Sequence, residues 1–303
     1  MLGRTLLWAS EKTKVKDFIT GSRLTSGVVE RFVAGDRLAD ALDAIRALND
    51  KAIGGILDLL GEGVVDPGGA QAAADDYLAA IKLIEETRVD TTVTVKLTQL
   101  GLAFDKGACI DHLRRLAAEA AAAGTEVEID MEQSEYVEDT LGIYRLLHAD
   151  FPQLRIAIQA YLRRTPADLE GMADLRPKVR LVKGAYAEPE DLAFQKRKEI
   201  DAQYSWLIRW LFQHGTDPAI ATHDGRLLDT AARVANEAGV TKDAFEFQML
   251  YGIRRELQAK LAAAGHRVRV YVPYGSAWYA YLMRRLAERP ANLRFFLRAV
   301  VRD

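Results

Sequence analysis

The sequence of 303 residues contains one cysteine, Cys109, which excludes an intrachain disulfide and a cysteine-rich metal site. No apolar run approaches the roughly 20 residues that a membrane-spanning helix needs, and the apolar part of residues 1–16 is too short and interrupted for a signal peptide. A charge excess is also missing, since 41 Lys and Arg stand against 43 Asp and Glu, so no global field attracts nucleic acid. These absences predict a cytoplasmic protein that binds no nucleic acid, or one that lies peripherally at the inner face of a membrane.

Two ligand-binding patterns are missing as well. No G-x-G-x-x-G occurs in the sequence, and a doubly wound dinucleotide-binding sheet usually carries this turn after its first strand. The histidines do not follow the spacing of metal ligands, so we expect no metal ion.

The sequence does contain short runs in which apolar and polar residues alternate, as in strands with one apolar face. Seven such runs lie at 92–98, 126–132, 156–161, 179–181, 220–223, 245–249 and 268–272, and a weaker one lies at 53–60. Helical patterns fill the gaps, at 72–86, 108–122, 137–148, 192–213, 226–238, 254–264 and 276–288. Strands that alternate with helices at intervals of roughly 25 to 40 residues predict a parallel sheet.

Eight strand–helix units close most economically into an α/β fold, the (βα)8 barrel of the TIM type. The doubly wound open sheet is the second choice because the glycine-rich turn is missing. We expect residues 1–50 to form N-terminal helices that pack on the barrel, and residues 51–303 to form the catalytic barrel with its C-terminal helix. The segment 187–216 is longer than a standard crossover, which predicts an extra helix between the fifth and sixth strands.

Each of the seven stronger runs places a polar residue near its carboxyl end. These residues are Lys96, Asp130, Gln159, Arg180, His223, Gln248 and Tyr271. Active sites of (βα)8 enzymes lie at the carboxyl ends of the strands, so we expect these side chains to converge there. Taken singly, a glutamine or histidine could equally be a hydrogen-bonded core residue.

The last barrel segment, 269–290, reads as a strand, a Pro-Tyr-Gly turn and a helix. The helix carries Arg284 and Arg285, two adjacent guanidinium groups suited to a carboxylate or a phosphate. The alternative is a solvated face on which Glu288 pairs with Arg284 at the i, i+4 spacing. Residues 292–303 continue as a basic amphipathic pattern, which suits either a membrane surface or packing against the barrel.

The motifs occur in an order that resembles the proline dehydrogenase family over about residues 50–292. They are L-G-E at 60–62, V-K-L-T at 95–98, I-D-M-E at 129–132, Q-A-Y at 159–161, R-L-V-K-G-A-Y at 180–186, A-T-H-D at 221–224, F-E-F-Q-M-L-Y-G at 245–252, and the segment 271–292. The resemblance implies a barrel that holds FAD without a Rossmann domain. It also implies oxidation of L-proline to Δ1-pyrroline-5-carboxylate, the first step of proline catabolism, with hydride passing to N5 of FAD and electrons then to a membrane quinone. The chain ends at Asp303, which is similar to monofunctional members, so a separate pyrroline-5-carboxylate dehydrogenase is expected downstream.

The resemblance also implies roles for individual residues. The catalytic set is Lys96, Asp130, Tyr271, Arg284 and Arg285. The substrate is bound by Lys96, Tyr186, Leu250, Tyr271, Arg284, Arg285 and Glu288. The cofactor is bound by Asp130, Met131, Gln159, Arg180, Val182, Lys183, Gly184, Ala185, Thr222, His223, Gln248 and Glu288. Glu62 matches an acid that pairs with a clamp arginine to gate the pocket.

Two other functions fit the residues before any comparison is made. Lys96 or Lys183 at a strand end could form a Schiff base, as in a (βα)8 lyase or aldolase. Alternatively, the barrel could bind a flavin without catalysis and act as a sensor. A colourless protein would favour the lyase, and proline binding without loss of flavin colour would favour the sensor.

Overall fold

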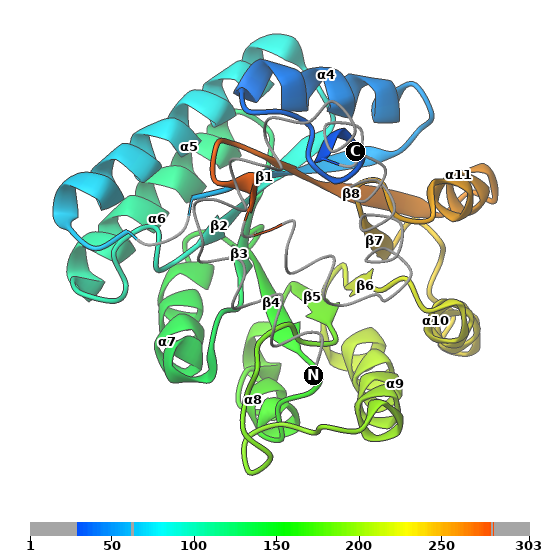
Figure 1. The fold of residues 1–303 in the computed structure, drawn as a ribbon. Helices are drawn as coiled ribbons and strands as arrows, with labels where there is room; N and C mark the ends of the chain where they lie inside the picture. The colour runs from blue at the N-terminus through cyan, green and yellow to red at the C-terminus, as the bar shows by residue number, and fades with distance from the viewer. Residues whose placement is uncertain (1–28, 62–63, 280, 282–303) are drawn as a thin grey trace, which may run out of the picture.

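Eight parallel strands close into a barrel in the order β1 to β8, as the computed structural model shows (Figure 1). The structure describes residues 29–61, 64–279 and 281. The strands are β1 Gly54–Leu59, β2 Thr91–Lys96, β3 Val127–Asp130, β4 Arg155–Gln159, β5 Val179–Val182, β6 Ala219–Ala221, β7 Glu246–Leu250 and β8 Arg267–Tyr274. The closed barrel confirms the predicted fold class, including the weaker first strand.

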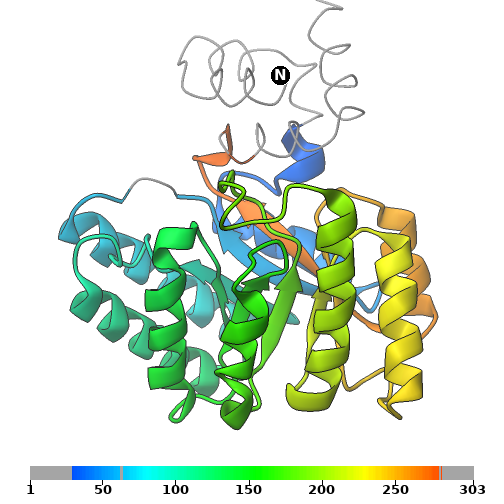
Figure 2. The ribbon, with the colours of Figure 1, turned by 90° about the horizontal axis from the view of Figure 1, so that it is seen from below.

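Helices surround the barrel and run alongside its strands (Figures 1 and 2). They are α4 Leu38–Asn49, α5 Pro67–Thr87, α6 Lys106–Ala122, α7 Val137–His148, α8 Thr165–Glu170, α9 Arg197–His214, α10 Gly225–Glu237 and α11 Arg255–Ala263. Local sequence sets several of the helix starts. Asp66 caps α5 by accepting a hydrogen bond from Gly69 N, and Pro67 occupies the first helical position, where no hydrogen bond is lost. Among the described residues, no helix is long and apolar enough to cross a membrane.

The apolar residues of the strands face outward and the polar residues face inward. On β2, Val93 and Val95 belong to the hydrophobic core that the helices cover. Thr94 and Lys96 alternate with them and reach across to β3, where Thr94 bonds Glu128 O and Lys96 bonds Asp130. Because alternate side chains of a strand point to opposite faces, the barrel interior is polar over much of its length.

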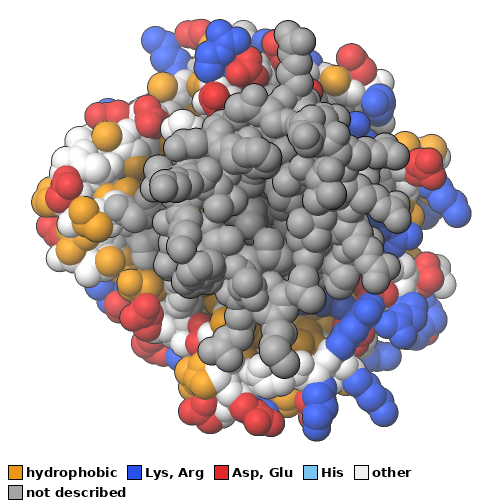
Figure 3. Space-filling view, viewed as in Figure 1, with side chains coloured by type: hydrophobic (Ala, Val, Ile, Leu, Met, Phe, Trp, Pro, Cys, Tyr) orange, Lys and Arg blue, Asp and Glu red, His pale blue; other side chains and the backbone are white. Residues whose placement is uncertain are grey.

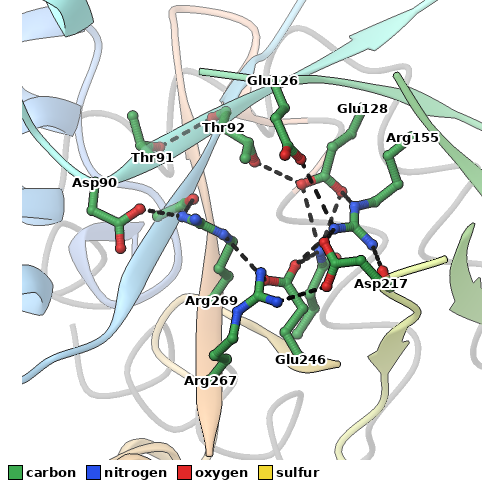
Figure 4. Close-up of polar contacts among 12 residues, drawn as sticks. Asp90, Thr91, Thr92, Glu126, Glu128, Arg155, Asp217, Glu246, Arg267 and Arg269 are labelled. Atoms are coloured by element: carbon green, nitrogen blue, oxygen red, sulfur yellow. Dashed lines mark hydrogen bonds and ion pairs between the residues drawn. The ribbon is translucent and has the colours of Figure 1, made fainter. Parts of the chain in front are cut away.

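Charged side chains fill the interior at the amino ends of the strands (Figure 4). Arg155 lies at the centre of this charged network, is 1% exposed and forms a 2.9 Å ion pair with Asp217. Glu246 at 3.7 Å and Glu128 at 3.8 Å also balance its charge. Buried charges persist where opposite charges compensate them, and the carboxylates around Arg155 do so.

The predicted extra helix between the fifth and sixth strands is wrong, because the described segment 183–218 holds α9 as its one helix. Residues 187–196 form an irregular loop before α9. An antiparallel bridge joins Leu162 to Ala193, and Phe194 N donates to Tyr161 O. Hydrogen bonds to the β4–α8 connection pair backbone groups of this loop, so the loop needs no helix to satisfy them. The extra residues that suggested a helix form this loop instead.

Candidate active site

The polar residues at the seven strand ends converge on one cavity of about 820 Å³. The lining includes Lys96, Asp130, Gln159, Arg180, His223, Gln248 and Tyr271. It also includes the other predicted site residues that the structure describes, which are Met131, Val182, Lys183, Gly184, Ala185, Tyr186, Thr222 and Leu250. The strand-end side chains therefore meet at one cavity, and its volume suits a cofactor together with a small substrate.

A lysine between two carboxylates forms one wall of the cavity. Lys96 Nζ lies 3.2 Å from Asp58 Oδ1 and 3.0 Å from Asp130 Oδ2. Burial opposes the charge on this lysine, but Asp58 and nearby tyrosine hydroxyls together outweigh burial and raise the pKa of Lys96 well above its ordinary value. The group is therefore a fixed ammonium, which can attract an anion and cannot readily act as an amine nucleophile.

Asp130 joins this wall to the next one through both of its oxygens. Oδ2 accepts from Lys96 and, at 2.7 Å, from the Tyr271 hydroxyl. Oδ1 accepts from Thr94 at 3.1 Å and from Arg180 Nη2. Four donors on one carboxylate hold its geometry.

Arg180 places a second buried cation at the cavity. Its guanidinium also donates to Glu128 Oε2 at 3.2 Å and stacks over the Tyr271 ring with 5.5 Å to the centroid. Glu128 is completely buried, which by itself favours the neutral acid, yet Arg180 and Arg155 outweigh burial and lower the pKa of Glu128 below its ordinary value. The guanidinium therefore faces the cavity as a cation held by the carboxylates of Glu128 and Asp130.

The opposite wall offers the features that a flavin nucleotide requires. Gln248 lines the cavity, and its buried Oε1 has no hydrogen-bond partner in the described part of the chain. The backbone of residues 182–186 runs along the cavity without side-chain bulk at Gly184. Arg180 and Lys183 supply positive charge for an electron-rich ring and for phosphates. The donors, acceptor and cations present here fit the group that the sequence implies.

Two features of position 184 require glycine: the backbone conformation and the close approach of the Tyr161 ring. Its φ of +120° lies in a region that other residues avoid, and a Cβ there would overlap the ring of Tyr161. We expect Gly184→Ala to lower the unfolding free energy by about 2 kcal/mol or more and to weaken cofactor retention. Thermal unfolding and the absorbance of the desalted protein measure the two effects.

The matched control is Gly142→Ala on the exposed side of α7, where a Cβ meets nothing within 4 Å. That change should leave stability unaltered or raise it slightly. Equal thermal stability of both variants would contradict the role assigned to Gly184.

An ion cluster stands at the mouth of the cavity between α9 and α10. Asp224 accepts from Arg197 at 2.6 Å and from Lys183 at 3.3 Å, and Lys183 also contacts Asp201 at 2.5 Å. Basic side chains gather toward these helices on the face seen in Figure 3, and Arg197 and Arg226 are 70% and 77% exposed. The cluster gives this rim an excess of positive charge next to the cavity.

Asp224 predicts a pH-dependent contribution to stability. Partial burial favours its neutral form, but the Arg197 hydrogen bond and Lys183 outweigh burial and lower its pKa from 3.8 to about 2. Since the folded value is the lower one, the contribution is complete above a pH of about 5 and is lost progressively as pH falls through 3.8 toward 2. Because its partner Arg197 is solvated, we expect Asp224→Asn to cost about 1 kcal/mol at neutral pH.

Thermal unfolding of both proteins from pH 7 to pH 3 measures this difference. The difference in Tm between the wild type and Asp224→Asn should be constant down to about pH 5 and should then become smaller. Asp229→Asn, at an exposed aspartate of the same helix, is the control and should change Tm less. A gap that widens in acid would contradict the assignment.

Several predicted residues lie outside the described part of the chain. They are the gate residue Glu62 and the clamp and cofactor residues Arg284, Arg285 and Glu288. Their neighbour Tyr281 is described, is buried and lines the cavity. The roles of these four residues stay predictions.

The structure adds two carboxylates that the strand-end pattern did not include. Asp58 of β1 is 1% exposed and pairs with Lys96, and Glu128 of β3 is 0% exposed and pairs with Arg180. A single charged residue in the otherwise apolar run 54–59 could have indicated Asp58. The spacing of two between Glu128 and Asp130 could have indicated that both share the inner face.

The barrel and its charged cavity at the carboxyl ends of the strands define a (βα)8 enzyme of the kind that binds a small ligand above the barrel. A family model described as proline dehydrogenase matches residues 41–298. The chain is 38% identical to "Proline dehydrogenase 1" of Bacillus subtilis subsp. natto, with 100% of both chains covered. It is 40% identical to "Proline dehydrogenase" of Deinococcus radiodurans over 91% of this chain and 90% of the relative.

The crystal structure of proline utilization A (PutA) from Bdellovibrio bacteriovorus, inactivated by N-propargylglycine, superimposes with a TM-score of 0.80 at 26% identity. That match covers 86% of this chain and 32% of the longer PutA chain. The chain belongs to the proline dehydrogenase family. It is similar over its full length to the Bacillus subtilis relative and over 86% of its length to one part of PutA.

Proposed function

We propose that this protein oxidises L-proline to Δ1-pyrroline-5-carboxylate with FAD as its cofactor and a membrane quinone as electron acceptor. Membership of the family supports proline oxidation, the first step of proline catabolism. The observation that carries the proposal is the single cavity in which the Lys96 ammonium, the Asp130 carboxylate and the Arg180 guanidinium meet. The chemistry that FAD supplies when bound is the acceptance of a hydride from the substrate.

The substrate half of the cavity lies at Lys96 and Tyr271. The fixed ammonium of Lys96 attracts the carboxylate of proline, and Arg284 and Arg285 are proposed to complete the clamp. Tyr186, Leu250 and Tyr281 line the same cavity and can enclose a small ring while leaving little room for longer amino acids. Because both Asp130 oxygens already accept two hydrogen bonds each, we assign this residue to positioning the cations.

The cofactor half extends from Arg180 to the loops that follow β5, β6 and β7. Arg180 would face the flavin ring, where positive charge favours the reduced anion. Lys183 would attract the phosphates. The remaining contacts are proposed for Met131, Gln159, Val182, Gly184, Ala185, Thr222, His223 and Gln248, with Glu288 beyond the described residues.

The electron acceptor and the next enzyme are proposed from chemistry. Reduced flavin must pass its electrons on, and a quinone in a membrane could receive them if the protein binds peripherally at the membrane face. Residues 292–303, the proposed contact, lie outside the described part of the chain. A separate pyrroline-5-carboxylate dehydrogenase would consume the product.

The two other functions are not favoured. A Schiff-base lysine must lose its proton, whereas Lys96 is held as an ammonium by Asp58 and Lys183 is ion-paired with Asp201 and Asp224. A non-catalytic sensor fits less well with full-length similarity to relatives that carry the name proline dehydrogenase.

Anaerobic reduction tests the proposal directly. The purified protein should be yellow, and L-proline added without air should remove the visible absorbance of the flavin. D-proline and glycine serve as control ligands and should leave the colour unchanged. A protein that stays colourless after loading with FAD and desalting would exclude the flavin, and a yellow protein that L-proline does not reduce would exclude the reaction.

A further inference from the structure

Glu128 lies beside Arg155 in the charged network at the amino ends of the strands (Figure 4), and it also contacts two residues of the cavity at the carboxyl ends. Its side chain is 0% exposed and is not among those that line the cavity. Thr92 Oγ1 donates to Oε1 at 2.6 Å, and Arg155 of the lower network lies 3.8 Å from Oε2. Thr92 and Arg155 therefore fix the Glu128 carboxylate on the side of the amino ends of the strands.

On the side of the carboxyl ends, the Glu128 carboxylate accepts hydrogen bonds from two side chains that line the cavity. Arg180 Nη1 and Gln248 Nε2 each donate to Oε2 at 3.2 Å. Gln248 Nε2 also donates to Glu246 Oε1 at 2.7 Å. Two carboxylates thus fix the amide nitrogen of Gln248, which leaves its Oε1 as the atom available to a donor on a ligand.

The charge of Glu128 acts through Arg180. The guanidinium has two carboxylate partners, Glu128 and Asp130, and Glu128 is the one that ligands in the cavity do not meet. Removal of its negative charge would leave Arg180 with one counter-charge and would raise the positive potential at the cavity. Reduced flavin is more negative than oxidised flavin, so this change would favour the reduced form.

We propose that Glu128 is a positioning residue that sets the orientation of Arg180 and Gln248 and thereby tunes the redox equilibrium of the bound cofactor. The inference rests on the proposed function, because it requires a flavin in the cavity.

The test is the midpoint potential of the purified holoenzyme carrying Glu128→Gln, which keeps the shape of the side chain and removes its charge. We expect the ratio of affinities for reduced and oxidised flavin to rise about tenfold, a shift of about +30 mV for a two-electron couple. The matched control is Glu246→Gln. Glu246 is 1% exposed and also accepts from Gln248 Nε2, but among the described residues its ion pairs go to Arg155, Arg267 and Arg269 and not to Arg180. This variant therefore controls for the Gln248 contact and for the loss of a buried charge that does not touch Arg180.

We expect Glu246→Gln to change that ratio less than twofold. An unchanged potential in Glu128→Gln, or an equal shift in both variants, would overturn the inference, since the second result would show a general field effect. If Glu128→Gln does not fold, Glu128→Asp keeps the charge but withdraws it from both partners, and the expected shift has the same sign and a smaller size. An unchanged midpoint potential in Glu128→Asp would also overturn the inference.

The two levels of the argument remain separable. Wild-type protein that holds no flavin, or is not reduced by L-proline, would contradict the proposed function. Wild-type protein that is reduced normally, with variants of unaltered potential, would contradict the role of Glu128 alone.

Discussion

Replacement of Lys96 by methionine should lower kcat/KM for L-proline by about 100-fold or more. Lys96 is the cation between Asp58, which is 1% exposed, and Asp130. Truncating one partner of a buried, hydrogen-bonded charge pair at a binding site costs about 2–5 kcal/mol of binding, because the other charge is left without compensation. A loss of 3 kcal/mol in transition-state binding corresponds to a factor of roughly 100 in rate.

The effect should appear in both kinetic constants. KM should rise because the ammonium no longer attracts the carboxylate of proline, and kcat should fall because Asp130 and Tyr271 lose a fixed neighbour. Steady-state kinetics with an artificial electron acceptor measure both constants. The flavin content of the same sample shows whether the cofactor half is intact, and we expect it to change little.

Lys178→Met provides a control of the same chemistry at the other end of the barrel. Lys178 is 7% exposed and pairs with Glu126 at 2.6 Å and with Asp217 at 3.0 Å. Its loss should lower Tm while the KM of the folded protein changes less than threefold. Similar kinetic losses in both variants would show that Lys96 acts through stability and not through the site.

Replacement of Asp130 by asparagine should cost a similar factor and should damage both halves of the cavity. Asparagine keeps the shape of the side chain but replaces one acceptor oxygen with a donor. Either the Lys96 and Tyr271 side or the Thr94 and Arg180 side then loses its acceptor, and both cations lose a counter-charge. We expect kcat/KM to fall about 100-fold and flavin to be lost more readily on desalting.

The double variant Lys96→Met with Asp130→Asn should lose much less than the product of the two single effects, because the residues form one ion pair. Asp217→Asn is the control, since Asp217 also accepts from several cations but lies at the amino ends of the strands. It should lower stability without changing KM. Retention of full activity in Asp130→Asn would refute the central place given to Asp130.

Local patterning was enough to predict the strands and the convergence of the side chains at their carboxyl ends. Alternation fixed which residues of β2 face the helices, and Val93 and Val95 do lie in the core there. The rule that sites of such barrels lie at the carboxyl ends then placed Lys96, Asp130 and Tyr271 together, as the structure confirms. Both steps depend only on the period of two along a strand.

The partners of those residues could not be predicted in the same way. Asp58 and Lys96 are 38 positions apart, and Glu128 and Gln248 are 120 apart. Which pairs meet depends on the stagger of the closed barrel, and no local pattern encodes it. The extra helix expected in the segment 187–216 is absent for a similar reason, since residues 187–196 form a loop whose backbone pairs with Leu162 and Tyr161.

The sequence by itself determined the class of fold, the residue types at the strand ends and the family to which the chain belongs. Tertiary structure alone decided that Asp58 and Asp130 share Lys96, and that a residue outside the cavity, Glu128, holds two residues within it. The physical reason is that periodicity is a property of neighbouring residues. Charge compensation in a buried interior depends on distances across the barrel, and closure of the sheet sets those distances.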